Sequence, residues 1–210
     1  MTQTALDMIT PPVLLEVFRK IATNIRRHSV ARKLAGQERL HLACGSNILE
    51  GWANIDMYSN EQVIDWDLTN GLPVRSGAIG LIFCEHFIEH VTLEQAKALL
   101  VECYRCLRSN GTLRLSTPSL KKIVEEYLLG RVSEWDDVGW SPATPCQMLN
   151  EGLRLWGHQF VYDDNELRRL LNEAGFREIR QVAWRESTTP GLSELECRPF
   201  HGEVIFEATK

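Results

Sequence analysis

The sequence lacks any apolar run approaching the ~18 residues of a membrane-spanning helix, and its N-terminus lacks the apolar segment of a signal peptide. Its six cysteines are scattered through 210 residues, a chain long enough to build a full core without disulfides. We therefore expect reduced thiols and a cytoplasmic protein with one main domain and some elaborations.

An excess of positive charge is also absent. The formal net charge is −5, whereas a nucleic-acid-binding face needs Lys and Arg, so no nucleic-acid partner is expected. The charge is uneven, because residues 1–40 carry seven Lys and Arg against three Asp and Glu, a net +4 that leaves −9 for the rest.

Apolar residues recur at helical spacing in the basic part, from Pro11 and Pro12 to a stop at Gly36: Leu14, Val17, Phe18, Ile21 and Ile25. We interpret residues 1–38 as a basic amphipathic helical extension that covers the sheet and keeps its cations in solvent. Peripheral contact with an anionic membrane or a partner is the less favoured alternative.

A predicted strand–turn–strand unit, "LHLACGSNILEGWANID" at residues 40–56, organises the rest of the chain. The small residue Gly45 allows a ligand to approach the backbone, and Asp56, at the end of the second strand, can accept both ribose hydroxyls. The dinucleotide fingerprint G-x-G-x-x-G is missing, which favours a nucleoside ligand without phosphates. An NAD-dependent oxidoreductase is therefore the less favoured alternative.

Strand and helix patterns alternate from residue 40 onward, which predicts an α/β fold with a parallel sheet and helices on both faces. Strands are expected at residues 40–43, 52–56, 63–68, 78–84 and 112–116, and a hairpin from residues 179–184 and 203–208. Capping boxes, Thr92 with Gln95 and Asp163 with Glu166, predict two helix starts. Ligands bind beyond the carboxyl ends of such strands. The residues expected to meet there are residues 43–45, Asp56, Asp67, residues 84–86 and Thr117.

Residues 131–146 have no clear period and are rich in tryptophan and proline. Together with a short helix expected at residues 148–155, they suggest a lid or binding loop at residues 131–160 within the main domain, residues 39–210. Stacking of Trp135, Trp140 or Trp156 on a sugar or another ring competes with ordinary packing, which is the default.

Together these motifs resemble the class I S-adenosylmethionine-dependent methyltransferases. "LHLACGSN" is similar to the first motif of that family, "NID" and "DWDL" to its acidic strand tips, and "LIFCEHFIEH" and "CLRSNGTLRLSTP" to its fourth- and fifth-strand signatures. The match covers residues 39–118, and "YDDNELRRLLNEAGF" also resembles the family. A finer resemblance, through the "GH…Y" segment, is to small predicted methyltransferases associated with cell-envelope polysaccharide synthesis.

The resemblance implies a Rossmann-like, doubly wound, seven-stranded sheet, mostly parallel with an antiparallel last strand, and S-adenosylmethionine as cofactor. Asp56 would accept the ribose hydroxyls, and Asp67 would meet the adenine. The implied cofactor-binding residues are Ala43, Cys44, Gly45, Asp56, Met57, Asp67, Leu68 and Glu85. Ala43 departs from the glycine usual in the family, and we expect its Cβ to crowd the methionine part of the cofactor.

Methyl transfer to oxygen also needs the acceptor's proton removed, a task that suits histidine. His86 is the first candidate base and His158 the second. The structural alternatives are that His86 bonds the backbone at a strand–helix junction and that His158 anchors the lid.

Two further patterns carry weaker signals. The string "HFIEH" from His86 to His90 matches H-x-x-E-H, but that motif needs one helix presenting both imidazoles, and here the first histidine ends a strand. No metal is therefore expected. Cys103 and Cys106 lie near the end of a helix rather than at its start, so Cys103 is expected in the core rather than in a redox pair.

We therefore expect an enzyme that transfers a methyl group from S-adenosylmethionine to a small molecule or glycan precursor at oxygen. Residues 84–87, "CEHF", depart from the Asn/Asp-Pro-Pro-Tyr/Phe signature of amino-group DNA methyltransferases, which argues against DNA. A non-catalytic nucleoside-binding or interaction module of the same fold is the alternative. No motif identifies the acceptor or the oligomeric state.

Overall fold

The computed structural model describes residues 12–58 and 60–210, with side chains from residue 20 onward. The strands are β1 (Arg39–Leu42), β2 (Ala53–Asp56), β3 (Val63–Asp65), β4 (Ile79–Glu85), β5 (Leu107–Thr117), β6 (Glu178–Gln181) and β7 (Val204–Thr209). The α-helices are α2 (Pro12–Lys33), α3 (Leu93–Cys106), α4 (Leu120–Leu128), α5 (Pro145–Arg154) and α6 (Asp164–Ala174). Short 3₁₀ helices are η1 (Leu68–Asn70), η2 (Ile88–His90), η3 (Asp136–Val138) and η4 (Leu155–Gly157).

The strands form one sheet in the order β3-β2-β1-β4-β5-β7-β6. All neighbouring pairs are parallel except those of β7, which runs antiparallel to both β5 and β6. The predicted seven-stranded, mostly parallel sheet of an α/β fold is thereby confirmed. The strand order reverses between β1 and β4, which is the position where open α/β sheets bind ligands.

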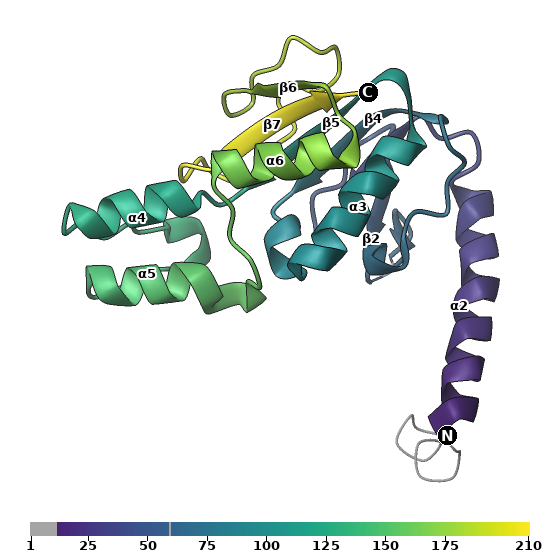
Figure 1. The fold of residues 1–210 in the computed structure, drawn as a ribbon, viewed down its shortest axis with the longest axis horizontal. Coiled ribbons are helices and arrows are strands. Elements are labelled where there is room, and N and C mark those ends of the chain that lie inside the picture. The colour runs from purple at the N-terminus through teal and green to yellow at the C-terminus, as the bar shows by residue number, and fades with distance from the viewer. Residues whose placement is uncertain (1–11, 59) are drawn as a thin grey trace.

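The two faces of the sheet are covered in different ways. On one face, alternate residues such as Leu42 and Ile82 join the main core with α3 and α6, which lie side by side in Figure 1. On the other face, Phe83 packs against Trp52 and against Leu192 of the long β6–β7 connection. That connection, residues 182–203, therefore lies close to the end of β4.

The predicted capping box of α3 is confirmed, with Thr92 and Gln95 bonding reciprocally. Residues 109–111, Ser-Asn-Gly, are a local turn signal, and the start of the fifth strand predicted just after them at residue 112 is wrong. α3 ends at Cys106, and β5 begins at Leu107, which pairs with Ile79. A register irregularity between the two strands accommodates the extra residues, and tertiary pairing here overrides the local turn signal.

The basic helix α2 is confirmed, but its predicted packing on the sheet is wrong where it can be observed. Ile21 and Ile25 are 50% and 68% exposed, while only Val30 and Leu34 near the C-terminal end join the core. The helix extends away from the sheet, so only its last turns touch the domain (Figure 1). Predicted stripe residues Leu14, Val17 and Phe18 have side chains outside the described part.

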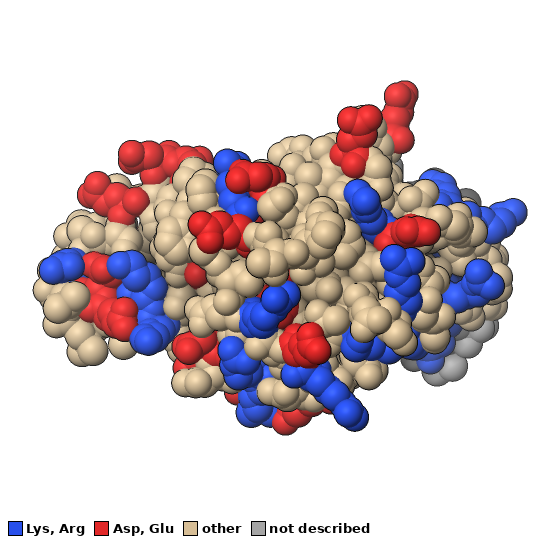
Figure 2. All heavy atoms as spheres, turned by 90° about the horizontal axis from the view of Figure 1, so that it is seen from above, with Lys and Arg blue, Asp and Glu red and all other residues tan. Residues whose placement is uncertain are grey.

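Two arginines of α2 bond to the domain. Arg27 donates to the carbonyls of Asn70 and Leu72, and Arg26 pairs with Asp65. Lys and Arg side chains gather at this end of the molecule in Figure 2. Within the described residues, no helix combines the length and apolar character needed to cross a membrane.

Candidate active site

The turn after β1 and the tip of β2 are joined as the sequence predicts. The Asp56 carboxylate accepts hydrogen bonds from the backbone N–H of Gly45 at 2.9 Å and of Met57 at 2.6 Å. Asp56 is half-buried, and Met57 is two-thirds exposed. A carboxylate held by two N–H donors at the end of a strand has a fixed direction and keeps lone pairs for a ligand.

The same turn contains two residues in the left-handed backbone region, Ala43 at φ 52° and Gly45 at φ 54°. Glycine adopts this region freely, whereas an L-residue such as alanine pays about 1–2 kcal/mol. A Cβ added at Gly45 would meet only the Tyr58 hydroxyl, at 3.8 Å, so there is room for a ligand beside this backbone. The side chain of Cys44 between them is buried, and burial raises the pKa of its thiol to about 11.

Asp67 and Leu68 follow β3, next to this turn. The backbone N–H of Trp66 donates to the backbone carbonyl of Asp56 at 2.8 Å, which holds the end of the third strand beside that of the second. Asp67 caps η1 by accepting from the N–H and hydroxyl of Thr69, and Leu68 is buried. The residues predicted for the adenine therefore lie next to those predicted for the ribose.

At the end of β4, Glu85 is buried, and its carboxylate accepts from the backbone N–H and the thiol of Cys197 at 3.2 and 3.3 Å. Cys197 belongs to the β6–β7 connection, which thus bonds directly to a residue predicted to contact the cofactor. No local pattern could indicate this contact, because it joins residues 112 positions apart.

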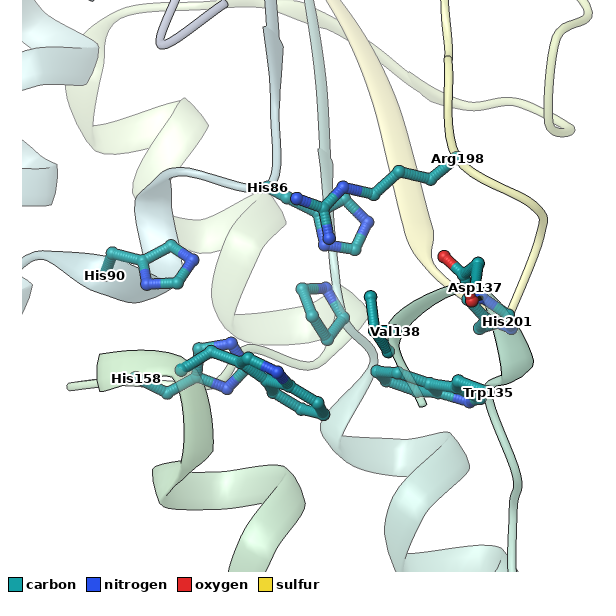
Figure 3. Close-up of a pocket in the computed structure, with 10 residues that line it drawn as sticks. His86, His90, Trp135, Asp137, Val138, His158, Arg198 and His201 are labelled. Carbon is teal, nitrogen blue, oxygen red and sulfur yellow. Dashed lines mark hydrogen bonds and ion pairs between the residues drawn. The ribbon is translucent and has the colours of Figure 1, made fainter. Parts of the chain in front are cut away.

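Beyond β4 lies a cavity lined by imidazole and indole rings and by charged groups (Figure 3). Its walls come from segments that are far apart in the sequence: His86, His90, Pro118, Trp135, Asp137, Val138, Trp156, His158, Arg198 and His201. Both predicted base candidates, His86 and His158, line it. In Figure 3, His90 and His158 lie on one side, Trp135 and His201 on the other, and His86 between them.

His86 lies between two carboxylates. Its Nε2 is 3.4 Å from Glu203 Oε1, and its Nδ1 is 3.5 Å from Glu89 Oε1. Burial alone would lower the pKa of His86, but these carboxylates outweigh burial and leave it raised. Burial raises the pKa of Glu203, but the bond and charge of His86 and hydrogen bonds from backbone N–H groups together outweigh burial and leave this pKa lowered. The imidazole is thus flanked by groups that stabilise its protonated form.

His158 and His90 meet edge to face, with ring centroids 5.0 Å apart. His158 Nδ1 lies 3.0 Å from the Gly152 carbonyl, and burial lowers the pKa of His90. The fully buried Glu89 lies between these two rings and His86. A ligand atom from each of Glu89, His90 and His158 lies within 4.8 Å of the others, a set that could hold a metal ion.

The tryptophans divide into two groups. Trp140 is buried against Ile123 and Met148 in a small core between α4 and α5, so ordinary packing explains it. Trp135 stacks on Trp156, with ring centroids 5.6 Å apart, and on His201 at 4.7 Å. All three rings line the cavity, and Trp135 also packs against the small core around Trp140.

Sequence reasoning missed Glu203, Arg198, His201 and Asp137, which all lie at or next to this cavity. The antiparallel direction of the last strand was the available signal, because its first residue then lies at the edge where the parallel strands end. The interpretation of Cys103 as a core residue is confirmed: Cys103 and Cys106 are both buried, free thiols.

Comparison with known proteins agrees with this geometry. Residues 40–115 match a family model described as a methyltransferase domain. The fold is similar to that of a SAM-dependent methyltransferase from Archaeoglobus fulgidus, with 17% identity, a TM-score of 0.50 and coverage of 88% of this chain and 94% of that one. The fold is also similar to that of an S-adenosylmethionine-dependent methyltransferase from Mesorhizobium loti, with 14% identity, a TM-score of 0.51 and coverage of 88% of this chain and 98% of that one. A search among curated proteins gives no match.

Proposed function

We propose that this chain is a class I S-adenosylmethionine-dependent methyltransferase and that it methylates an oxygen atom of a small molecule or glycan precursor. The observation that carries the proposal is the position of His86, which follows β4 at the switch point of the sheet and lines the aromatic cavity. Ligand sites in this architecture lie at that edge, so the cavity is where we place the acceptor.

In this proposal S-adenosylmethionine is the cofactor, and when bound it would supply an electrophilic methyl group. The residues around the β1 turn fit it: the half-exposed Asp56 carboxylate has the direction and the lone pairs to accept ribose hydroxyls, and the backbone at Gly45 has free space beside it. Asp67 and Leu68 would hold the adenine edge. Glu85 would lie between cofactor and acceptor, at the tip of β4.

The acceptor hydroxyl must lose its proton as its oxygen attacks. In the proposal His86 takes this proton, while Glu203 and Glu89 stabilise the imidazolium that results. Both carboxylates lie at least 3.4 Å from the ring nitrogens, longer than an ideal hydrogen bond, so the imidazole can turn one nitrogen toward an acceptor. Orientation of the acceptor supplies much of the remaining rate enhancement.

The cavity walls support a ring-shaped acceptor. The rings of Trp135, Trp156 and His201 line the cavity and could contact a sugar or another ring, and Arg198 and Asp137 offer polar contacts beside them. This combination of flat and polar walls favours a hydroxylated cyclic acceptor.

The test is transfer of isotope-labelled methyl from S-adenosylmethionine to a panel of sugars, sugar nucleotides, phenols and amines, with the methylated atom located by NMR. We expect O-methyl products and a 10²- to 10⁴-fold lower kcat in His86→Ala, with cofactor affinity unchanged. Replacement of the exposed His28 by alanine is the matched control. Turnover at the wild-type rate in His86→Ala, or a product methylated only at nitrogen, would refute the proposal.

His158→Ala tests the second candidate base in the same assay. His158 Nδ1 already faces the Gly152 carbonyl, which leaves only Nε2 available to an acceptor. Loss of turnover in His158→Ala combined with wild-type turnover in His86→Ala would move the base role to His158.

A further inference from the structure

We propose that Glu89, His90 and His158 form a binding site for a divalent transition-metal ion at the wall of the acceptor cavity. Glu89 and His90 are adjacent in η2, and His158 follows η4. One ligand atom from each residue lies within 4.8 Å of the other two. Two imidazoles and a carboxylate are a donor set that binds Zn²⁺, with further coordination positions left for water or substrate.

The state of Glu89 points to a missing partner. Its side chain is fully buried, and its Oε2 accepts a hydrogen bond from the Thr117 hydroxyl at 2.8 Å. Its Oε1 is buried without a hydrogen-bond partner among the described residues. The nearest imidazole nitrogens, on His86 and His90, are 3.5 and 3.8 Å away. A buried carboxylate oxygen without a hydrogen bond is costly, and a cation bound between Glu89 and the imidazoles would remove that cost.

The surrounding contacts hold the three residues as metal ligands are usually held. His158 Nδ1 faces the Gly152 carbonyl, which can only accept a hydrogen bond, so Nδ1 carries the proton. Nε2 is then left free to bind a metal. Thr117 orients Glu89. Gln159 joins the two segments, because its backbone N–H donates to the Glu89 carbonyl at 2.7 Å and its side-chain amide donates to the His90 carbonyl at 2.8 Å.

The donor set selects among metals. Imidazole nitrogen suits Zn²⁺ and its first-row neighbours, whereas Mg²⁺ and Ca²⁺ prefer sites built from oxygen. Because His90 and His158 line the cavity, an ion held by them would lie within reach of an acceptor hydroxyl, where it could lower the pKa of that hydroxyl. This consequence rests on the proposed methyl transfer to oxygen, whereas the site itself does not.

The site uses only part of the "HFIEH" string. His86 belongs to the end of β4 and contacts Glu203, and the third ligand, His158, comes from a segment 68 positions beyond His90. Sequence spacing therefore could not reveal it, because the metal motif that the string resembles needs both of its own histidines.

The test is calorimetric titration of EDTA-treated, full-length protein with Zn²⁺ and, separately, with Mg²⁺. We expect one Zn²⁺ per chain with micromolar or tighter affinity, and Mg²⁺ binding at least ~100-fold weaker. Glu89→Gln and His158→Ala should each weaken Zn²⁺ binding by more than ~100-fold, because loss of a direct ligand exceeds the 10- to 100-fold cost of outer-shell changes. His28→Ala, which removes an exposed imidazole, should bind Zn²⁺ like the wild type.

Absence of Zn²⁺ binding in the wild type, or equal Zn²⁺ affinity in the wild type and both site variants, would overturn the proposal. Affinity for S-adenosylmethionine, measured on the same samples, shows that the variants are folded. The visible spectrum of the Co²⁺-loaded protein gives a second readout, and its bands should change in His158→Ala. Metal binding is measured here without an acceptor, so a negative result would not bear on methyl transfer.

Discussion

Protonation of the buried His41 should make the stability of this protein fall steeply below pH 6.5. His41 lies in β1 and is 1% exposed, with Nδ1 3.0 Å from Asn54 Oδ1. The Asn54 amide nitrogen donates to the carbonyls of Leu49 and Trp52, so Oδ1 is the atom that faces His41. Nδ1 of His41 must therefore be the donor, and a second proton would have to be placed on Nε2 inside the domain.

The size of the effect on stability follows from the shift in the pKa of His41. Burial lowers the pKa of His41 from 6.5 to about 4, outweighing the bond to Asn54 and the charge of Asp56. A group whose pKa is depressed by folding contributes stability that is present above its unfolded pKa and is lost as the pH falls. At about 1.4 kcal/mol per unit, His41 should remove about 3 kcal/mol between pH 6.5 and 4.

The matched variant is His41→Gln, which can still donate to Asn54 but does not titrate. Urea unfolding at pH 7, 6 and 5 would give the free energy of unfolding of each protein. The wild type should lose about 1.4 kcal/mol per pH unit relative to His41→Gln below pH 6.5. His28→Gln, at an exposed position, should follow the wild type. Parallel pH curves for wild type and His41→Gln would refute the reasoning.

Three other substitutions test the site and its support. Asp56→Asn should weaken S-adenosylmethionine binding by ~100-fold in calorimetry, because charge-assisted bonds contribute about 1.5–3 kcal/mol each; unchanged affinity would reject the ribose assignment. Ala43→Gly should relieve about 1–2 kcal/mol of left-handed strain against about 0.5–1 kcal/mol of added chain entropy, and it should tighten cofactor binding. Weaker binding would contradict the predicted crowding. Arg114→Met should cost about 3–5 kcal/mol in urea unfolding, because the fully buried Arg114 binds Glu196 at 2.6 Å and Glu207 at 2.8 Å. Adding Glu196→Gln and Glu207→Gln should restore much of this loss, and a triple variant no more stable than Arg114→Met would refute the assignment.

Much of the secondary structure and of the sheet could be predicted, because the sequence signals for them are local. A capping box such as Thr92 with Gln95 satisfies backbone groups within one turn, so four residues suffice to identify it. The meeting of Gly45 with Asp56 was predictable because parallel strands that are adjacent in the sheet end at the same edge. Local signals failed where pairing overrode them, as at the start of β5, and where burial depends on a helix's direction, as for Ile21 and Ile25.

Local sequence patterns thus sufficed to predict the alternation of strands and helices, the edge of the sheet where their polar tips meet, and the residues around the β1 turn. The packing of β7 and its preceding connection, which brings Glu203 to His86 and Cys197 to Glu85, could not be predicted from such patterns. Only the tertiary structure placed His158 against His90 beside the buried Glu89. The physical reason is that periodicity records which side of an element is buried, whereas contacts between distant segments depend on how the elements pack against one another.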